Sequence, residues 1–207
     1  MIFTTTQKKD ALKAVAIISL KITVAGLAIG YLHAYDFLLG ILLLTRILVL
    51  IYTDYIKATA KNWILLAGML LTGSLGVLVE IWGVSNGYWE YHDLTNNRQL
   101  PYWLPLAWMY AFRFIYKLER QVIAILKLKK LLHKTYLAIF ITAVLPVFGE
   151  VITINLGVWT YSWPYQFLGV PLYAIICLVM LHMGINFILS LVVRKKKIHD
   201  PVFINEK

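Results

Sequence analysis

Long runs of apolar residues, separated by short polar stretches, dominate this sequence. A helix needs about 20 mainly apolar residues to cross the hydrocarbon core of a bilayer. Six runs come close to that length, and each predicts a transmembrane helix. They are Ala11–His33, Asp36–Tyr52, Asn62–Gly83, Pro101–Lys117, Thr135–Val158 and Leu168–Val193. The pattern therefore predicts an all-α integral membrane protein, with residues 1–207 forming a single six-helix transmembrane domain.

Composition supports this class of protein. The chain is 60% hydrophobic and only 14% charged, with a mean hydropathy of +0.73, whereas soluble domains have about 25% charged residues. The single cysteine, Cys177, excludes a disulfide framework.

Basic residues are distributed unevenly among the loops. The chain has 20 Lys and Arg against 10 Asp and Glu, and most of these bases precede the first run, follow the sixth, or lie in the second and fourth connections. The alternate connections carry only Arg98. Because basic loops remain on the cytoplasmic side, we expect a multi-pass protein of the cell membrane with both termini cytoplasmic. Anionic lipid headgroups account for the excess of base, so we expect no nucleic-acid partner.

The connection between the fourth and fifth runs, residues 118–134, mixes apolar residues with bases. This pattern is typical of a basic amphipathic segment on the cytoplasmic leaflet, or of a helical extension of the fourth run. A plain basic connector is the alternative.

The sequence contains a repeat with an offset of 70 residues. Each copy has an acid, a glycine seven residues later, and then a Trp and a Tyr at alternate positions, and a Pro-Leu pair opens the next apolar run. The copies are Glu80, Gly87, Trp89 and Tyr91, then Glu150, Gly157, Trp159 and Tyr161. We therefore expect helices three–four and five–six to be a duplicated hairpin, related by an axis along the membrane normal.

Small residues share a helical face with each repeated acid. They are Gly73, Gly76 and Gly83 around Glu80, and Ala143, Pro146 and Thr153 around Glu150. Residues three and four apart lie on one side of a helix, and small side chains allow helices to approach closely in lipid. We expect both acids to face the packed interior. Helix packing and an interfacial aromatic belt would explain the glycines and aromatics without further chemistry.

Ionisable residues inside a membrane span usually face the bundle interior or a wet cavity. Glu80 and Glu150 are the only carboxylates that the predicted spans place below the interface, and Arg46 and Arg113 lie nearer the middle. Ion pairing between these groups is one interpretation. The other is a polar pocket in which both acids point beneath an aromatic lid.

Two carboxyl groups in an apolar pocket are suited to acid chemistry. Such a group can hold a proton at neutral pH and protonate a carbon–carbon double bond, while aromatic faces stabilise the resulting carbocation. The candidate catalytic residues are Glu80 and Glu150. The candidate substrate-binding residues are Trp89, Tyr91, Trp159, Tyr161, Arg46, Arg113, His182 and Asn186. The five histidines are scattered and no metal-binding motif occurs, so we expect neither a metal nor another cofactor.

Parts of both copies resemble membrane proteins of carotenoid biosynthesis. The elements Glu80-x-x-Gly83-Val84-x-x-Gly87 and Leu104-Pro105-Leu106-Ala107-Trp108 resemble the carotenoid hydratase type. Gly157-Val158-Trp159-Thr160-Tyr161, followed by Pro171-Leu172, is similar to the signature of membrane lycopene cyclases. The cyclases continue with two glutamates, where this chain has Tyr173-Ala174. The resemblance thus implies roles as acids for Glu80 and Glu150 alone.

Three functions follow from these features. The first is an integral-membrane enzyme that acts on an isoprenoid or other lipid by proton-initiated hydration or cyclisation. The second is a small six-helix substrate-binding component of a transporter, which would use the same tryptophans to stack a ligand. The third is a structural membrane protein without catalytic activity.

Overall fold

The structure is a computed structural model that describes residues 3–59 and 61–204. The helices are α1 (Thr5–Leu32), α2 (Asp36–Ile51), α3 (Trp63–Ser85), α4 (Leu104–Leu126), α5 (Leu131–Asn155) and α6 (Leu172–Lys196). A 3₁₀ turn, η1 (His33–Tyr35), precedes α2, and a π-helical turn, η2 (Tyr52–Ile56), follows it. The strands are β1 (Trp89–Tyr91), β2 (Trp159–Tyr161), β3 (Gln166–Phe167) and β4 (Val170–Pro171). The expected helical character is confirmed.

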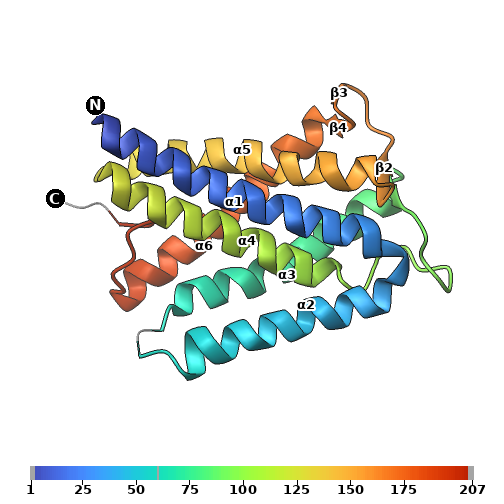
Figure 1. Cartoon of the computed structure of the whole chain (residues 1–207), viewed down its shortest axis with the longest axis horizontal. Coiled ribbons are helices and arrows are strands. Elements are labelled where there is room, and N and C mark those ends of the chain that lie inside the picture. Colours follow the sequence, from blue (N-terminus) through green and yellow to red (C-terminus); the bar gives the residue numbers. More distant parts are fainter. Residues whose placement is uncertain (1–2, 60, 205–207) are drawn as a thin grey trace.

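The expectation of six separate helices is corrected. Within the described residues there are five uninterrupted helical segments, because η1 joins α1 to α2 without a break and η2 extends the run from Thr5 to Ile56. Although the backbone stays helical at η1, the chain reverses direction there (Figure 1). Four of the five segments are long and apolar enough to cross a membrane. The exception, α4, carries charged residues such as Arg113, Lys117 and Glu119 along its length.

Residues 118–134 are divided between two helices, and their first part is the helical extension of the fourth run. Helix α4 continues to Leu126, since Val122 and Ile123 keep the helical spacing of its buried face. Lys127 then adopts a left-handed conformation, with φ of 51°, and ends the helix. Helix α5 begins at Leu131, so the connection between the two helices is short.

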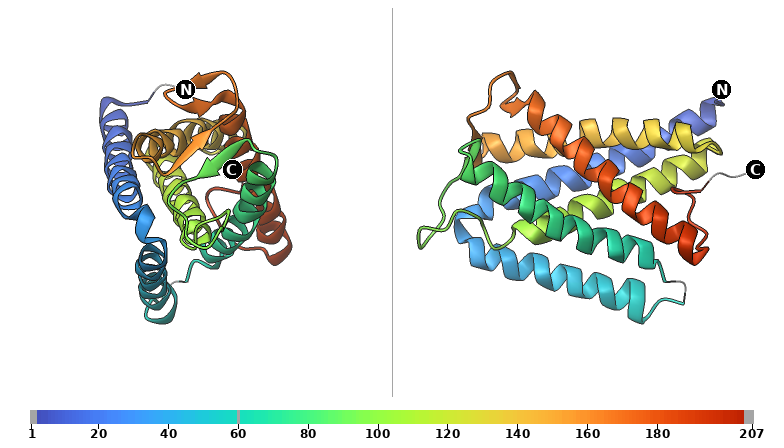
Figure 2. Two further views of the ribbon diagram at one scale, coloured as in Figure 1. Left: turned by 90° about the vertical axis from the view of Figure 1, so that its right-hand side faces the viewer. Right: turned by 180° about the vertical axis from the view of Figure 1, so that it is seen from behind.

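Four helices form a ring in which α3 packs on α4, α4 on α5, α5 on α6 and α6 on α3. Helix α1 lies across α4 and α5, while α2 lies on the outer side of α4 (Figures 1 and 2). The approach of α1 to α5 is close because Gly26 and Gly30 face Ile152 and Leu156. Small residues thus permit a close helix contact at this pair too, outside the faces of Glu80 and Glu150 for which the sequence predicts such contacts.

Equivalent turns end α3 and α5. Gly87 and Gly157 have φ of +69° and +77°, and no atom lies within 4 Å of the place where a Cβ would be. The amide of Gly87 donates to the carbonyl of Val84 and that of Gly157 to the carbonyl of Ile154. These bonds form a left-handed helix cap, which glycine adopts at no steric cost. The repeated glycine therefore serves the turn and not helix packing.

The strands that follow these caps pair with each other. Strands β1 and β2 are antiparallel, with Trp89 opposite Tyr161 and Tyr91 opposite Trp159. The flanking bonds are equivalent too, since His92 donates its amide to the carbonyl of Val158 and Ser162 donates to that of Tyr88. Each contact is thus matched by its partner 70 residues away, and the two copies meet around a local two-fold axis.

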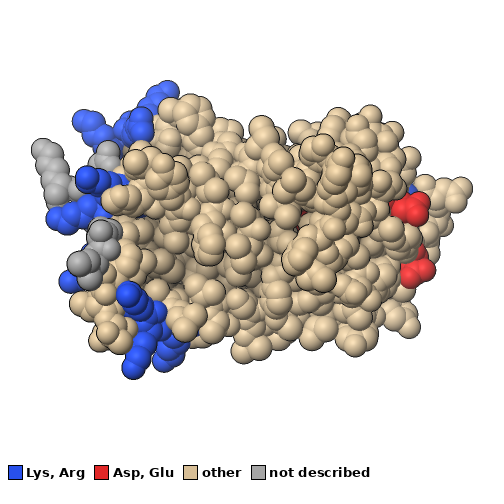
Figure 3. All heavy atoms as spheres, turned by 90° about the horizontal axis from the view of Figure 1, so that it is seen from above, with Lys and Arg blue, Asp and Glu red and all other residues tan. Residues whose placement is uncertain are grey.

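Charge is segregated along the long axis of the molecule. Lys and Arg side chains gather at the end that holds both chain termini, and acidic side chains are visible at the opposite end (Figure 3). Lys207, the last base of the sequence, lies outside the described residues. At the acidic end, Arg98 forms an ion pair with buried Asp36, which also accepts the amide of Tyr102.

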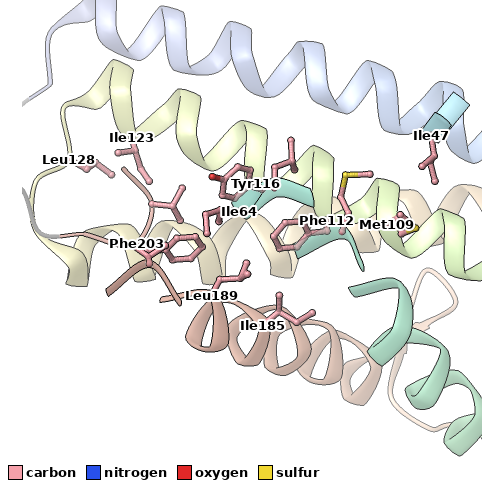
Figure 4. Packing of buried hydrophobic residues seen from close by; sticks show 14 residues of the cluster. Ile47, Ile64, Met109, Phe112, Tyr116, Ile123, Leu128, Ile185, Leu189 and Phe203 are labelled. Carbon is pink, nitrogen blue, oxygen red and sulfur yellow. The ribbon is translucent and has the colours of Figure 1, made fainter. Parts of the chain in front are cut away.

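The residues after α6 fold back into the basic end of the bundle. Val202 and Phe203 are buried in a cluster with Ile64, Tyr116 and Leu189 (Figure 4). Tyr116 donates its hydroxyl to Asp200, a buried carboxylate. Lys134 donates to the carbonyl oxygens of Pro201 at 2.7 Å and Ile204 at 2.9 Å. These contacts fix the tail against α4 and α5.

Candidate functional site

A cavity of about 670 Å³ lies among α1, α2, α4 and α5, and one end of it reaches β1 and β2. Its walls are mainly apolar and come from residues such as Leu20, Ile29, Leu43, Phe114 and Leu145. Eight of the ten candidate site residues line it, namely Glu80, Glu150, Trp89, Tyr91, Trp159, Tyr161, Arg46 and Arg113. The cavity has the size and lining of a site for a hydrophobic ligand.

Glu80 is the most strongly hydrogen-bonded group of the cavity. Its side chain is buried, and one carboxylate oxygen accepts the indole N–H of Trp89 at 2.8 Å and the hydroxyl of Tyr91 at 3.0 Å. The other oxygen accepts the indole N–H of Trp108 at 3.2 Å. Three donors around one carboxylate stabilise a negative charge there.

Two glycines of α3 make this arrangement possible. A Cβ at Gly83 would lie 1.8 Å from the ring of Trp89, and one at Gly76 would lie 2.5 Å from the ring of Trp108. Because these glycines flank Glu80 by three and four residues, both indoles rest on the helix backbone beside the carboxylate. The small residues around Glu80 therefore leave room for the two indoles that donate hydrogen bonds to it.

Glu150 occupies the matching position on α5 with fewer partners. Among the described residues it accepts only the hydroxyl of Tyr161, at 3.1 Å, which is the counterpart of the bond from Tyr91 to Glu80. The second copy has Thr153 where the first has Gly83, and Ala174 where the first has Trp108. The second copy therefore lacks both the space on its helix backbone that an indole needs and the second indole itself. The sequence differences explain why the two acids differ.

The two repeated tyrosines act as donors. Loss of solvent around each phenol and the nearby carboxyl group raise the pKa of Tyr91 and of Tyr161 well above the ordinary value of a tyrosine. Both hydroxyls therefore keep their protons and can donate to Glu80 and Glu150 across the physiological range of pH.

Neither acid forms an ion pair within the described part of the chain, contrary to the ion-pair interpretation. Arg113 instead contacts Asp54 at 3.3 Å, and Lys117 contacts the same carboxylate at 3.6 Å. Asp54 lies in η2, which the chain reaches only after α2 has crossed the bundle, so the sequence does not reveal this pairing.

His182 and Asn186 do not line the cavity. His182 lies 2.8 Å from an oxygen of Glu119, and the side-chain nitrogen of Asn186 lies 3.0 Å from the same histidine nitrogen. All three side chains are buried between α4 and α6. Glu119 is thus a further buried carboxylate of the bundle, outside the cavity. The predicted end of the fourth span at Lys117 left it outside the membrane, whereas α4 continues past it.

Aromatic residues lie in two groups at the end of the site that is near β1 and β2. Trp89, Tyr91, Trp159 and Tyr161 face the cavity from the paired strands. A second group on the side of α3 and α6 consists of Trp82, Tyr88 and Trp163, with the rings of Tyr88 and Trp163 stacked at 4.6 Å.

A second, smaller void of about 30 Å³ borders both acids on the side of α6. Trp163, Ala174 and Cys177 also line it. Its volume is enough for about one water molecule. Both carboxyl groups thus lie between the large cavity and this small void.

The candidate site residues omit four that line the cavity, namely Trp103, Trp108, Tyr110 and Lys21. Of these, Trp108 belongs to the motif that carries the resemblance, and Lys21 is an ionisable residue within the first predicted span. Trp103 is 2% exposed, and its indole nitrogen has no hydrogen-bond partner among the described residues. The spacing of Gly76 and Gly83 around Glu80 indicates that bulky groups can pack on the helix backbone there. The spacing alone does not identify those groups as the rings of tryptophans.

Among the described residues, no group of three or more His, Cys, Asp or Glu side chains is arranged to hold a metal ion. Comparison of the chain with protein-family models, curated proteins and solved structures finds no match. Functional inference therefore rests on the geometry of the cavity.

Proposed function

We propose that the protein spans a membrane with all six α-helices, that both termini are cytoplasmic, and that α3–α4 and α5–α6 are a duplicated hairpin. The segregation of basic residues to the end with both termini supports this orientation. Helix α4 is shielded by α1, α2, α3 and α5, so its charged residues have protein neighbours in place of lipid. The two-fold pairing of β1 with β2 supports the duplication.

Within this framework, the cavity is the active site of an enzyme that acts on an isoprenoid by proton chemistry. One observation carries the proposal, namely that equivalent carboxyl groups from the two copies line a single apolar cavity with aromatic walls and have no ion-pair partner among the described residues. Helix packing alone does not require two unpaired acids at one cavity.

The different surroundings of the acids assign their roles. Glu150, with a single donor, is the proton donor, whereas Glu80, with three donors, is the carboxylate that receives a proton. The proton of Glu150 and the π electrons of a carbon–carbon double bond form a new C–H bond, which leaves a cation on the other carbon. Aromatic faces of Trp89 and Trp159 stabilise that cation.

The cation is consumed in one of two ways. In hydration, water forms a C–O bond with the cationic carbon and gives up a proton to Glu80. In cyclisation, a second double bond attacks the cation, and a neighbouring C–H proton passes to Glu80. One proton enters and one leaves in either case, so no oxidant or reductant is needed. The small void that borders both acids has room for about one water molecule, which would carry the proton back to Glu150.

Deuterium labelling tests this chemistry directly. The protein in lipid nanodiscs is incubated in D₂O with an acyclic polyene, lycopene, and the extracted product is analysed by mass spectrometry. We expect a C–D bond in the product, either with added D₂O or in a cyclised isomer. Glu150→Gln should reduce the rate at least roughly 100-fold while folded protein remains similar in amount.

Two outcomes contradict the proposal. If Glu150→Gln incorporates deuterium at the original rate, the carboxyl group is not the proton donor. If the ligands released from the purified protein include a water-soluble vitamin and no isoprenoid, the cavity belongs to a transporter component.

A further inference from the structure

Three cationic side chains line the same cavity at a common depth. Along α1, α2 and α4, at 1.5 Å per residue, Lys21, Arg46 and Arg113 lie about 14–17 Å from the ends nearest β1 and β2. Glu80 and Glu150 lie only about 8 Å from the corresponding ends of α3 and α5. The cations thus form a separate level of the cavity, deeper than the acids.

At this level of the cavity, the cationic side chains outnumber the carboxylates that contact them. Asp54 is the carboxylate that contacts Arg113, and the same carboxylate also contacts Lys117. Lys21 and Arg46 have no carboxylate partner within residues 3–59 and 61–204, and both are exposed on the cavity side of their helices. A cation in the middle of a bilayer is costly and normally has a partner or faces water. The hydroxyl of Tyr110 lies near Arg46 and adds a further polar group.

We propose that the ligand of the cavity is an amphiphile with a phosphate-type anionic head at Lys21, Arg46 and Arg113. Its isoprenoid tail lies along the apolar walls toward the acids. This inference deepens the proposed function and rests on it for the isoprenoid nature of the tail. A phosphate-type head supplies the negative charge that this level lacks, and Arg recognises such oxygens with paired N–H donors.

The arrangement also selects the part of the tail that reacts. The acids lie about 6–9 Å beyond the cations along the helix axes, by the same rise per residue. A head bound at the cations therefore brings a double bond close to the head beneath Glu150, and the remaining tail runs on past Trp103 and Trp159. The protein would act near the head of its substrate and not at its far end.

Binding measurements test the head without relying on turnover. Native mass spectrometry of the full chain is used to titrate geranylgeranyl phosphate, geranylgeraniol, inorganic phosphate and a phosphatidylglycerol. We expect the prenyl phosphate to bind at least about tenfold more tightly than the alcohol, since only the phosphate engages the cations. Inorganic phosphate and phosphatidylglycerol should bind more weakly than the prenyl phosphate.

Charge-removing variants locate the contact. Arg46→Gln and Lys21→Gln should each weaken prenyl phosphate binding about tenfold and leave alcohol binding unchanged. Arg46→Lys, which keeps the charge but loses the paired donors, should weaken binding less than Arg46→Gln does. Lys57→Gln, which removes a base from the connection between η2 and α3, is the matched control and should bind as the unmodified protein does.

The outcomes separate this inference from the proposed chemistry. Equal binding of alcohol and phosphate, or unchanged binding in both Arg46→Gln and Lys21→Gln, overturns the anionic head and leaves the deuterium experiment to judge the acids. Equal binding of phosphatidylglycerol and prenyl phosphate assigns the cations to bulk lipid and overturns the inference too. If geranylgeranyl phosphate binds as expected but gains no deuterium when it replaces lycopene in the D₂O experiment, the head is correct and the acid chemistry is wrong.

Discussion

Replacement of Gly83 by alanine tests how the helix backbone seats the donor of Glu80. The new Cβ would lie 1.8 Å from Cη2 of Trp89, and the backbone of α3 cannot withdraw because the helix packs along α4 and α6. The indole must therefore move. Its N–H bond of 2.8 Å to Glu80 is then lost.

The size of the effect follows from three contributions. Loss of a hydrogen bond to a charged group costs about 1.5–3 kcal/mol. Overpacking of a tight site costs about 1–3 kcal/mol. The better helix propensity of alanine offsets up to about 1 kcal/mol of these two costs. We expect Gly83→Ala to lower the free energy of unfolding by roughly 2–4 kcal/mol.

Unfolding in detergent micelles, followed by circular dichroism, measures this difference against a matched control. Gly184 lies within α6, and no atom comes within 4 Å of the place where a Cβ would be. Gly184→Ala should therefore be neutral or stabilising. In a Trp89→Leu background Gly83→Ala should lose most of its effect, since the obstructing ring is gone. Equal stability of Gly83→Ala and Gly184→Ala would refute the reasoning.

Four further results are expected. Glu80→Gln should destabilise the fold by about 1–3 kcal/mol, because the new amide N–H₂ must face one of three donors. Glu150→Gln should change stability little, since Tyr161 can donate to the amide oxygen, and thermal melts of the two variants distinguish the acids. Phe203→Ala should cost about 3–5 kcal/mol through the cavity it leaves, and should expose the tail to limited proteolysis. Reporter fusions at Asn96 and Ser162 should lie outside the cytoplasm, and a cytoplasmic signal at either site would contradict the orientation.

The sequence by itself predicted the helical character of the chain and its repeated elements. Apolar runs of sufficient length predict helices for lipid whatever their neighbours, because each helix satisfies its own backbone hydrogen bonds. The repeat placed Glu80 and Glu150 on matching helix faces, and the structure brings both to one cavity. The glycine after each acid was also visible, although its role as a left-handed cap was not.

The number and ends of the helices were predicted less well. A helical 3₁₀ turn joins α1 to α2, and α4 runs on through Glu119 to Leu126. Charged residues normally mark the end of a span, but here the helix continues past Lys117, and Glu119 is buried beside His182 of α6.

Only the tertiary structure decided the partners of the polar groups. It paired Arg113 with Asp54, gathered His182 with Glu119 away from the cavity, and directed the indole of Trp108 to Glu80. Each pair joins residues from different helices, and helical periodicity fixes the face of one helix but not which helix packs opposite it. The choice of partner depends on how the helices rotate and cross, which is a property of the folded bundle.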